Sequence, residues 1–454
     1  MPQPNSRARQ PLMRQRSYED SLDDAGCCKS TTIIVSVLFF CGIAALGLSL
    51  VGMLVTENIG SDSESTITMT PTTTFSDSTT TSSISMSSEP SPTPSKCTKR
   101  IVGLFTEIES SPIKRSQLRK LTHAVFAYLQ MNSDGSLRFK NDRILNRFLD
   151  LRKKAREVSG DLKLMVSIGG ADNSNNFSGV LADTDKRRFF LESIISFLKE
   201  HDIHGVDLFW KWPKEYEQSE YTKFLKELKL RMTKGQVLSI TAPPAGIDNW
   251  EYGFDLNEIL KYVDFINVLT MDYYGPWPNK WGTPTGPTSP LYSGIREKAN
   301  FNVDYTMQYY SCETSQPLKF NIVIPFYARL WRNVREPLDP EGSNTFRHVE
   351  LKNDETQGEA YISRWTVKDE KWITANATWD EETKSSFIFD QKARKFLTFE
   401  TKQSIAAKME YVKSRNLGGV WIWSVDQDDS RNTLLNRVAS HDMCTSGDTI
   451  EYDC

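Results

Sequence analysis

Residues 204–213 read HGVDLFWKWP, a short and largely apolar run that holds one aspartate, one lysine, Phe209 and two tryptophans. Alternate side chains of a strand point the same way, so Asp207, Phe209 and Lys211 are predicted to project to one side. In a closed barrel that side is the interior. Taken alone, a Gly-Val-Asp run is typical of an apolar barrel strand with a single acid. Its meaning depends on the strands that surround it in the sequence.

From Cys97 onward, short β-branched or apolar runs alternate with longer amphipathic segments, which is the pattern of repeated βα units. A helix over residues 186–201 is predicted to turn Phe189 and Phe190 inward and to lead into the strand at 204–213. The count of eight strands predicts an α/β fold with a (β/α)8 barrel, whose sites lie at the carboxyl ends of the strands. The other seven strands are expected at residues 101–106, 124–129, 162–170, 237–242, 265–271, 320–324 and 420–423.

The motifs on these strands resemble those of glycoside hydrolase family 18, the chitinases and their relatives. In that family the fourth strand reads Asp-Gly-(Ile/Val)-Asp-(apolar)-Asp-Trp-Glu-(aromatic)-Pro, which residues 204–213 follow closely. Residues 167–170 (SIGG), 269–277 (LTMDYYGPW) and 324–331 (IPFYARLW) match further family motifs. The resemblance covers about residues 100–439 and is greatest to nematode chitinase-like proteins with a degenerate catalytic motif. It implies a small α+β insertion at about residues 333–395.

The resemblance also implies what the degenerate strand has lost. In the family the last carboxyl of this strand protonates the glycosidic oxygen, and the middle Asp holds the N-acetyl group of the substrate. Phe209 stands at the middle Asp and Lys211 at the acid. Phe209 has no proton to give. A lysine has a pKa near 10.4, and if burial lowered that pKa, the amine would be mostly neutral and could hardly donate a proton. Neither residue can therefore serve as the general acid. We therefore predict a pseudoenzyme with no catalytic residue.

An active chitinase with a non-standard acid is the less favoured alternative. Glu215 and Glu217 lie just beyond Pro213, where the strand has ended, so their side chains would have to turn back toward the groove. The sequence suggests neither a metal nor an organic cofactor.

Other family positions give candidate sugar contacts. Met271 replaces the Tyr that holds the N-acetyl oxygen, and Leu104, Ile108 and Ala171 stand where chitinases often have aromatic residues. The surviving positions predict a site for chitin or related N-acetylglucosamine oligosaccharides, in which rings stack on the apolar faces of sugars. These positions are Asp272, Trp277, Tyr327, Arg329 and Trp423.

A second interpretation of the same residues stays open. They could hold one another as a structural network together with Asp207, which Lys211 would join, since a cation offsets carboxylates that are costly to bury. The domain would then be a scaffold for an extracellular protein partner. The net charge of −3 gives no reason to expect nucleic acid.

The region before the barrel has a different composition. Residues 1–31 are polar and are predicted to be a disordered cytoplasmic tail. Residues 32–55 are uncharged and long enough, at 1.5 Å per residue, to cross a bilayer core of roughly 30 Å, which predicts a transmembrane signal anchor. Residues 56–96, rich in Ser, Thr and Pro, are predicted to be a stalk. Lys and Arg before the anchor indicate a single-pass type II protein with its domain, 97–454, extracellular or luminal.

Covalent modifications follow from the same topology. Cys97, Cys312, Cys444 and Cys454 are even in number, which predicts two disulfides at the amino-terminal face of the barrel, with three pairings open. Asn176 and Asn376 begin glycosylation sequons. Palmitoylation of Cys27 and Cys28 is as plausible as unmodified thiols.

Overall fold

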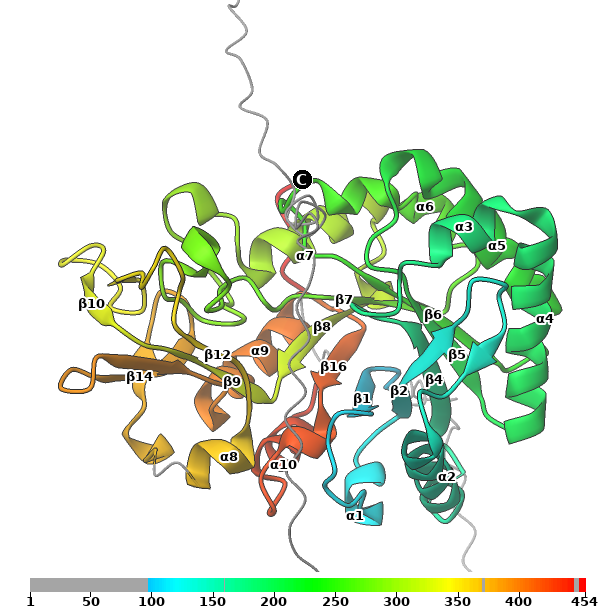
Figure 1. Cartoon of the computed structure of the whole chain (residues 1–454), viewed down its shortest axis with the longest axis horizontal. Coiled ribbons are helices and arrows are strands. Elements are labelled where there is room, and N and C mark those ends of the chain that lie inside the picture. The colour runs from blue at the N-terminus through cyan, green and yellow to red at the C-terminus, as the bar shows by residue number, and fades with distance from the viewer. Residues whose placement is uncertain (1–96, 159, 370–371, 445–448) are drawn as a thin grey trace, which may run out of the picture. The chain divides into compact units, whose positions relative to one another are not determined.

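Eight parallel strands close into a barrel in the computed structural model, which describes residues 97–158, 160–369, 372–444 and 449–454 (Figure 1). The ring closes because β1 pairs with both β2 and β16. All eight predicted strands are present, so the barrel prediction is confirmed. The barrel strands are β1 (Arg100–Thr106), β2 (His123–Met131), β4 (Lys163–Gly169), β5 (Gly205–Phe209), β6 (Val237–Ala242), β7 (Phe265–Val268), β8 (Phe320–Pro325) and β16 (Gly419–Trp423).

Helices cover the outside of this barrel. Their longest member, α4, begins after Asp183, whose carboxylate accepts hydrogen bonds from the amides of Asp185 and Lys186. Phe190 is buried, but Phe189 is 46% exposed, so its predicted inward orientation is wrong. The inner side of α4 runs through Phe190, Leu191 and Ile194, and Phe189 lies about 100° from Phe190 on the side away from Leu191. The helices are α1 (Arg115–Leu118), α2 (Asp142–Arg156), α3 (Phe177–Ala182), α4 (Thr184–His201), α5 (Gln218–Arg231), α6 (Leu256–Ile259), α7 (Val303–Thr314), α9 (Lys402–Ser414) and α10 (Thr433–Ala439).

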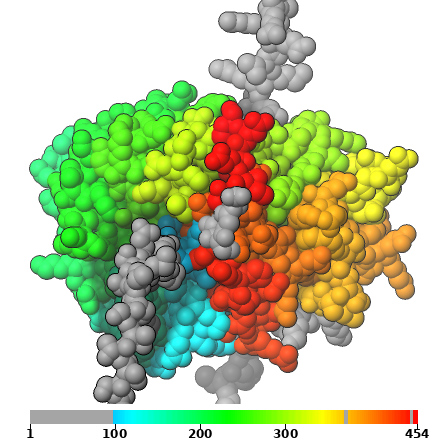
Figure 2. Space-filling model, turned by 180° about the vertical axis from the view of Figure 1, so that it is seen from behind, coloured from blue at the N-terminus to red at the C-terminus, as the bar shows by residue number. Residues whose placement is uncertain are grey.

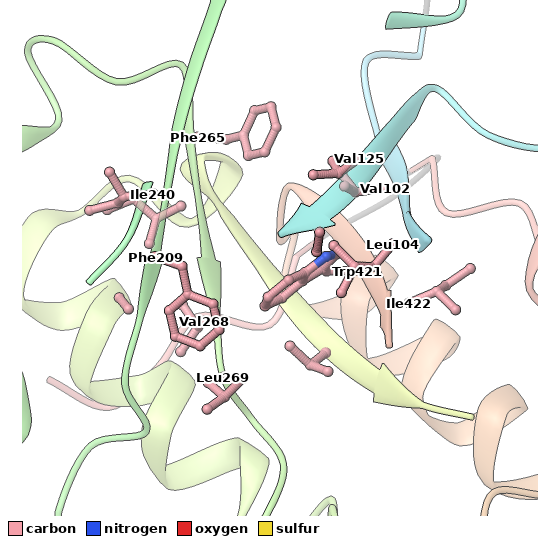
Figure 3. Packing of buried hydrophobic residues seen from close by; sticks show 14 of the residues in the cluster. Val102, Leu104, Val125, Phe209, Ile240, Phe265, Val268, Leu269, Trp421 and Ile422 are labelled. Atoms are coloured by element: carbon pink, nitrogen blue, oxygen red, sulfur yellow. The ribbon is translucent and has the colours of Figure 1, made fainter. Parts of the chain in front are cut away.

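Large apolar side chains fill the barrel interior, and Figure 3 shows Phe209 and Trp421 pointing into it from β5 and β16. A close approach between β4 and β5 explains a glycine of the SIGG motif. Gly169 has φ +108°, and a Cβ atom there would lie 2.2 Å from the carbonyl oxygen of Phe209. Any other residue at this position would push the two strands apart.

The insertion is a five-stranded antiparallel sheet with the order β12-β9-β15-β14-β13, seen at the left of Figure 1. It starts at Tyr327, directly after β8, and not at about residue 333 as predicted. Tyr327 and Arg329 therefore lie on its first strand. The elements of this region are β9 (Tyr327–Trp331), β10 (Val334–Pro337), β11 (Arg347–Val349), β12 (Gly358–Ser363), α8 (Arg364–Asp369), β13 (Thr378–Asp380), β14 (Ser385–Asp390) and β15 (Lys395–Thr398); the two-residue β3 (Leu137–Arg138) extends the barrel sheet beside β2.

Two disulfides fasten the carboxyl-terminal segment, and they select one of the three pairings that the sequence left open. Cys97 pairs with Cys444, and Cys312 pairs with Cys454. Cys97 precedes β1 and Cys312 lies in the last turn of α7, so both bonds are at the amino-terminal end of the barrel, as predicted. Figure 2 shows the segment in red on the surface of the domain.

The predicted membrane localisation needs correction. Among the described residues, no helix is long and apolar enough to cross a membrane. Even the 18-residue α4 carries charges along its length, since its outer side faces water. The predicted tail (1–31), anchor (32–55) and stalk (56–96), with Cys27 and Cys28, lie outside the described residues. A single-pass type II membrane protein therefore has no support here.

Candidate functional site

Asp207 is a buried carboxylate inside the barrel. It is 1% exposed and accepts hydrogen bonds from Ser167 Oγ (2.9 Å), Ser239 Oγ (2.7 Å), Thr241 Oγ1 (3.1 Å) and Asn267 Nδ2 (3.2 Å). Burial raises its pKa, and these hydrogen bonds offset part of that rise. All four donors are neutral, so Lys211 is not among its partners. The carboxylate serves to join four barrel strands.

Phe209 fills the position at which the resemblance implies a second carboxylate. It is 2% exposed. Its ring centre lies 5.6 Å from Trp212, 6.1 Å from Tyr128 and 6.1 Å from Trp423. An apolar plug of aromatic rings therefore closes the barrel interior beneath the mouth.

Lys211 lies two residues beyond the end of β5 and is exposed. Its backbone N–H donates to Ser174 Oγ at 2.9 Å. The prediction that Asp207, Phe209 and Lys211 project together into the interior thus holds for the first two only. The alternation of a strand stops where the strand stops.

Glu215 and Glu217 form the ends of a 3-10 helix that follows this strand. Glu215 is exposed, and the carboxylate of Glu217 accepts a hydrogen bond from the N–H of Lys214 at 2.8 Å. Both residues come after β5 has ended.

Four of the predicted sugar contacts come together at the mouth. Asp272 accepts hydrogen bonds from Tyr327 Oη and Arg329 Nη2. The Arg329 guanidinium is 2% exposed and lies over two rings, with its carbon 4.1 Å from the centre of Trp277 and 5.3 Å from that of Tyr327. Burial alone would lower the pKa of Arg329, but Asp272 and Tyr327 raise it, so the guanidinium stays charged. The carboxylate of Asp272 is 37% exposed and faces solvent in part.

The fifth predicted contact, Trp423, joins this group through a residue that the motifs did not indicate. Its Nε1 donates to Tyr361 Oη at 3.3 Å, and the Tyr361 ring stacks on Tyr327 with centres 4.7 Å apart. Tyr361 is 39% exposed and comes from β12 of the insertion, while Trp365 on α8 is 42% exposed. No motif covers this part of the insertion, so sequence reasoning had no signal for either ring.

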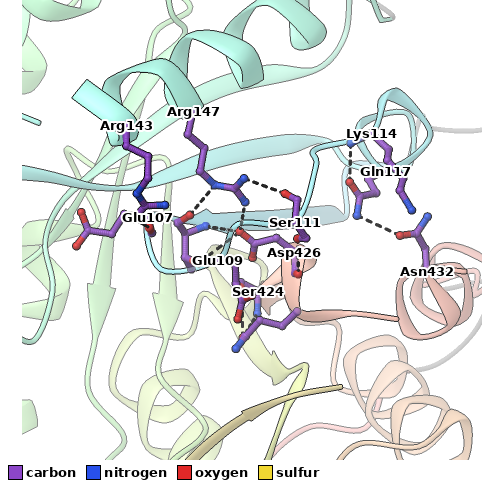
Figure 4. A network of polar contacts seen from close by, with 12 residues as sticks. Glu107, Glu109, Ser111, Lys114, Gln117, Arg143, Arg147, Ser424, Asp426 and Asn432 are labelled. Carbon is purple, nitrogen blue, oxygen red and sulfur yellow. Dashed lines mark hydrogen bonds and ion pairs between the residues drawn. The ribbon is translucent and has the colours of Figure 1, made fainter. Parts of the chain in front are cut away.

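A polar network fixes the loop that follows β1 (Figure 4). Asp426, just after β16, accepts hydrogen bonds from Arg147 Nη2 (2.8 Å) and from the amide of Thr106 (2.9 Å). Arg147 also donates to the carbonyl of Ser111 at 2.8 Å. Burial and nearby Asp426 raise the pKa of Glu109, which lies in the same loop. The network holds this edge of the mouth in place.

The described residues contain no group of three or more His, Cys, Asp or Glu side chains that could hold a metal ion. Asn176 and Asn376 differ in their surroundings. Asn176 is half-buried and its Nδ2 donates to the carbonyl of Met131 at 2.8 Å, whereas Asn376 is exposed.

Comparison with known proteins agrees with this geometry. Chitinase A1 of Niallia circulans is 24% identical over 65% of this chain, and a probable endochitinase of Caenorhabditis elegans is 26% identical over 68% of it. The chain spans about half the length of these two proteins, 44% and 52% respectively.

A solved structure shares the fold. The structure of human YKL-39, described as a pseudo-chitinase with retained chitooligosaccharide binding properties, has a TM-score of 0.63 and 20% identity, covering 75% of this chain and 98% of its own. The family model of the glycosyl hydrolases family 18 matches residues 100–428. This chain therefore belongs to glycosyl hydrolases family 18.

Proposed function

We propose that this chitinase-like protein binds chitin or related N-acetylglucosamine oligosaccharides at the barrel mouth and does not hydrolyse them. The observation that carries the proposal is the edge-to-face packing of Phe209 against Trp423, with ring centres 6.1 Å apart. It puts an apolar ring where the family has a carboxylate, and it helps to fix the orientation of a half-buried indole on which a sugar can stack.

The loss of hydrolysis rests on the missing acid. A general acid must lie within hydrogen-bond reach of the leaving oxygen and have a pKa near the working pH. Phe209 has no proton to give, Lys211 is an exposed amine, and Asp207 has its carboxylate engaged by four donors inside the barrel. The carboxylate of Glu217 accepts a hydrogen bond from the N–H of Lys214, the residue that precedes its short helix.

Sugar binding is supported by the remaining groups at the mouth. Trp423 and Tyr361 offer partly exposed rings joined by a hydrogen bond, and Asp272 offers a carboxylate that a sugar hydroxyl can reach. Arg329 and Tyr327 fix the orientation of this carboxylate, which lowers the entropy lost on binding. YKL-39 is an example of the same fold described as a pseudo-chitinase that binds chitooligosaccharides.

One observation favours a second candidate, an interaction scaffold with no sugar site. Asp272 is already hydrogen-bonded by Tyr327 and Arg329, and Ile108 is exposed at the mouth where chitinases often have an aromatic ring. A groove with fewer stacking rings holds sugars less tightly. In that case a protein partner would use the outer surface of the domain.

Calorimetric titration of the full-length chain with tetra-N-acetylchitotetraose separates the two candidates. We expect saturable binding that Tyr361→Ala and Trp423→Ala each weaken roughly tenfold, which corresponds to the loss of one stacking face. Trp423→Phe, which keeps a ring, should retain most of the affinity. Phe189→Ala, which removes an exposed ring from α4 on the outside of the barrel, is the matched control and should leave the affinity unchanged. Absence of binding at millimolar sugar would favour the scaffold.

A further inference from the structure

Positive charge is concentrated in one sector of the barrel. Residues 114–157 contain twelve Lys and Arg but only four Asp and Glu, in a chain whose net charge is −3. This sector comprises α1, β2, β3 and α2. The sugar site does not account for this excess.

Part of the excess has a structural explanation at the mouth. Arg147 pairs with Asp426 at 2.8 Å, and Arg143 donates to the carbonyl of Glu107 at 3.0 Å (Figure 4). Both residues belong to the first half of α2. These two cations fasten the loop after β1 to α2 at the mouth of the barrel.

Six more of the twelve cations lie at the opposite end of the barrel, and we name this group the basic face. It consists of Arg115, Arg119, Lys120, Arg152, Lys153 and Arg156. It comes from α1, the turn that follows α1, and the last turns of α2, two helices that lie side by side in Figure 1 and are joined by the Arg115–Glu157 ion pair. Because α1 and α2 each end just before the next barrel strand starts, this face is at the amino-terminal end, away from the mouth.

Acids neutralise only part of this face. Arg115 pairs with Glu157, and Arg156 pairs with Asp202 at 2.7 Å. Within the described residues, Arg119, Lys120, Arg152 and Lys153 form no ion pair, and the Lys120 ammonium donates only to the carbonyl of Ser116. Arg119 and Lys153 are exposed. A favourable interaction with the carboxyl end of α2 explains Lys153, but not Arg119 and Lys120, which follow the four-residue α1.

We propose that the basic face binds a sulfated polysaccharide. Unpaired cations on neighbouring elements match a polymer that carries a sulfate on successive sugars, and guanidinium groups donate two parallel hydrogen bonds to such oxyanions. Two disulfides are typical of a chain that folds in an oxidising compartment, where anionic glycans, and not nucleic acids, are the prevailing polyanions. The proposal does not depend on sugar binding at the mouth.

Chromatography of the full-length chain on immobilised heparin, followed by titration with soluble heparin, tests the proposal. The test variant is Arg119→Gln/Lys120→Gln/Lys153→Gln. The control variant is Lys223→Gln/Arg231→Gln/Lys234→Gln, which removes three exposed or near-surface charges on and after α5 and changes the net charge equally. We expect wild type and control to be retained at about 0.15 M salt and the test variant to bind roughly tenfold more weakly. De-sulfated heparin should not bind.

Three results would overturn the proposal. The first is no retention of the wild type at about 0.15 M salt. The second is an equal loss in both triple variants, because net charge alone would then explain binding. The third is equal affinity for double-stranded DNA, because the face would then not distinguish a sulfated sugar from another polyanion.

Discussion

Phe209 changes what the mouth can do because a phenyl ring and a carboxylate need opposite surroundings. The ring is satisfied by Tyr128, Trp212 and Trp423, whereas a carboxylate at this position would need donors or water. Asp207, two residues earlier, has four such donors from three neighbouring barrel strands, β4, β6 and β7. Strand β5 therefore buries both Asp207, which has hydrogen-bond donors, and Phe209, which has only aromatic neighbours.

Placing an aspartate at position 209, where the family has its middle Asp, is expected to destabilise the domain. Phe209→Asp puts an unpaired charge among aromatic rings and should lower the free energy of unfolding by roughly 3 kcal/mol or more. Phe209→Leu, the control, leaves an apolar side chain and should cost only about 1–2 kcal/mol. Denaturant unfolding measures both. Equal stability of the Asp variant and wild type would show that the plug is already hydrated.

The Asp272–Arg329 pair gives a second residue-scale prediction, because its partners differ in exposure. The Arg329 guanidinium is 2% exposed and Asp272 is 37% exposed. Within the described residues Arg329 Nε and Nη1 have no acceptor, so Asp272 is the main compensation for the buried charge. Asp272→Asn should therefore destabilise more than Arg329→Met, which removes the charge and keeps much of the volume. Thermal unfolding of the two variants in the reverse order would contradict this account.

At the scale of elements, the periodicity of the sequence did not predict where strands end. The run IVIPFYARLW at residues 322–331 is continuous in the sequence, yet it divides into β8 of the barrel and β9 of the insertion sheet. The alternation of side chains is the same in both sheets, so no pattern marks the change. Asp272 has φ +64° just beyond β7, a turn that the motif of residues 269–277 did not reveal.

The loop between β16 and α10 gives a pH prediction at this scale. Asp428 accepts hydrogen bonds from the amides of Leu434 and Leu435 at the start of α10. Burial nevertheless raises the pKa of Asp428 to about 6. The folded state then holds the proton more tightly than the unfolded chain, whose Asp has a pKa of about 3.9. This stabilisation is complete below about pH 4 and is lost as the pH rises through about 6.

Asp428→Asn removes this titration. Relative to wild type, the variant should gain roughly 3 kcal/mol of stability between about pH 4 and about pH 7. Denaturant unfolding of both proteins across this range measures the difference. Parallel curves would mean that the amide donors outweigh burial and keep the carboxylate at its ordinary pKa.

For the whole molecule, the sequence predicted the barrel well because eight apolar runs at βα spacing and four family-like motifs agree on it. It predicted the location of the disulfides but not their pairing, since all four cysteines lie at one end of the barrel. It missed Tyr361, which the insertion brings to Trp423 through tertiary folding that no local pattern records. It predicted no basic face, because the net charge of −3 conceals an excess confined to one sector.

The Cys312–Cys454 bond gives a prediction for the molecule as a whole. It closes a loop of 142 residues and fastens the last residues beside α7 and α9, where Ser414 accepts a hydrogen bond from the amide of Ile450. Cys312→Ser/Cys454→Ser should lower the free energy of unfolding by roughly 2–4 kcal/mol and expose the carboxyl terminus to proteases. Cys97→Ser/Cys444→Ser, which opens a loop of 347 residues, should cost at least as much. Unchanged stability of both variants would show that the barrel does not need these bonds.

The mouth of the barrel is tested most directly by recovering the sugar after binding. The full-length chain is saturated with tetra-N-acetylchitotetraose in a calorimeter, incubated, and the sugar is released and weighed by mass spectrometry. The account predicts measurable heat of binding and recovery of the intact tetrasaccharide. Recovery of shorter oligosaccharides would contradict it, because neither Phe209 nor Lys211 can supply the acid that hydrolysis needs.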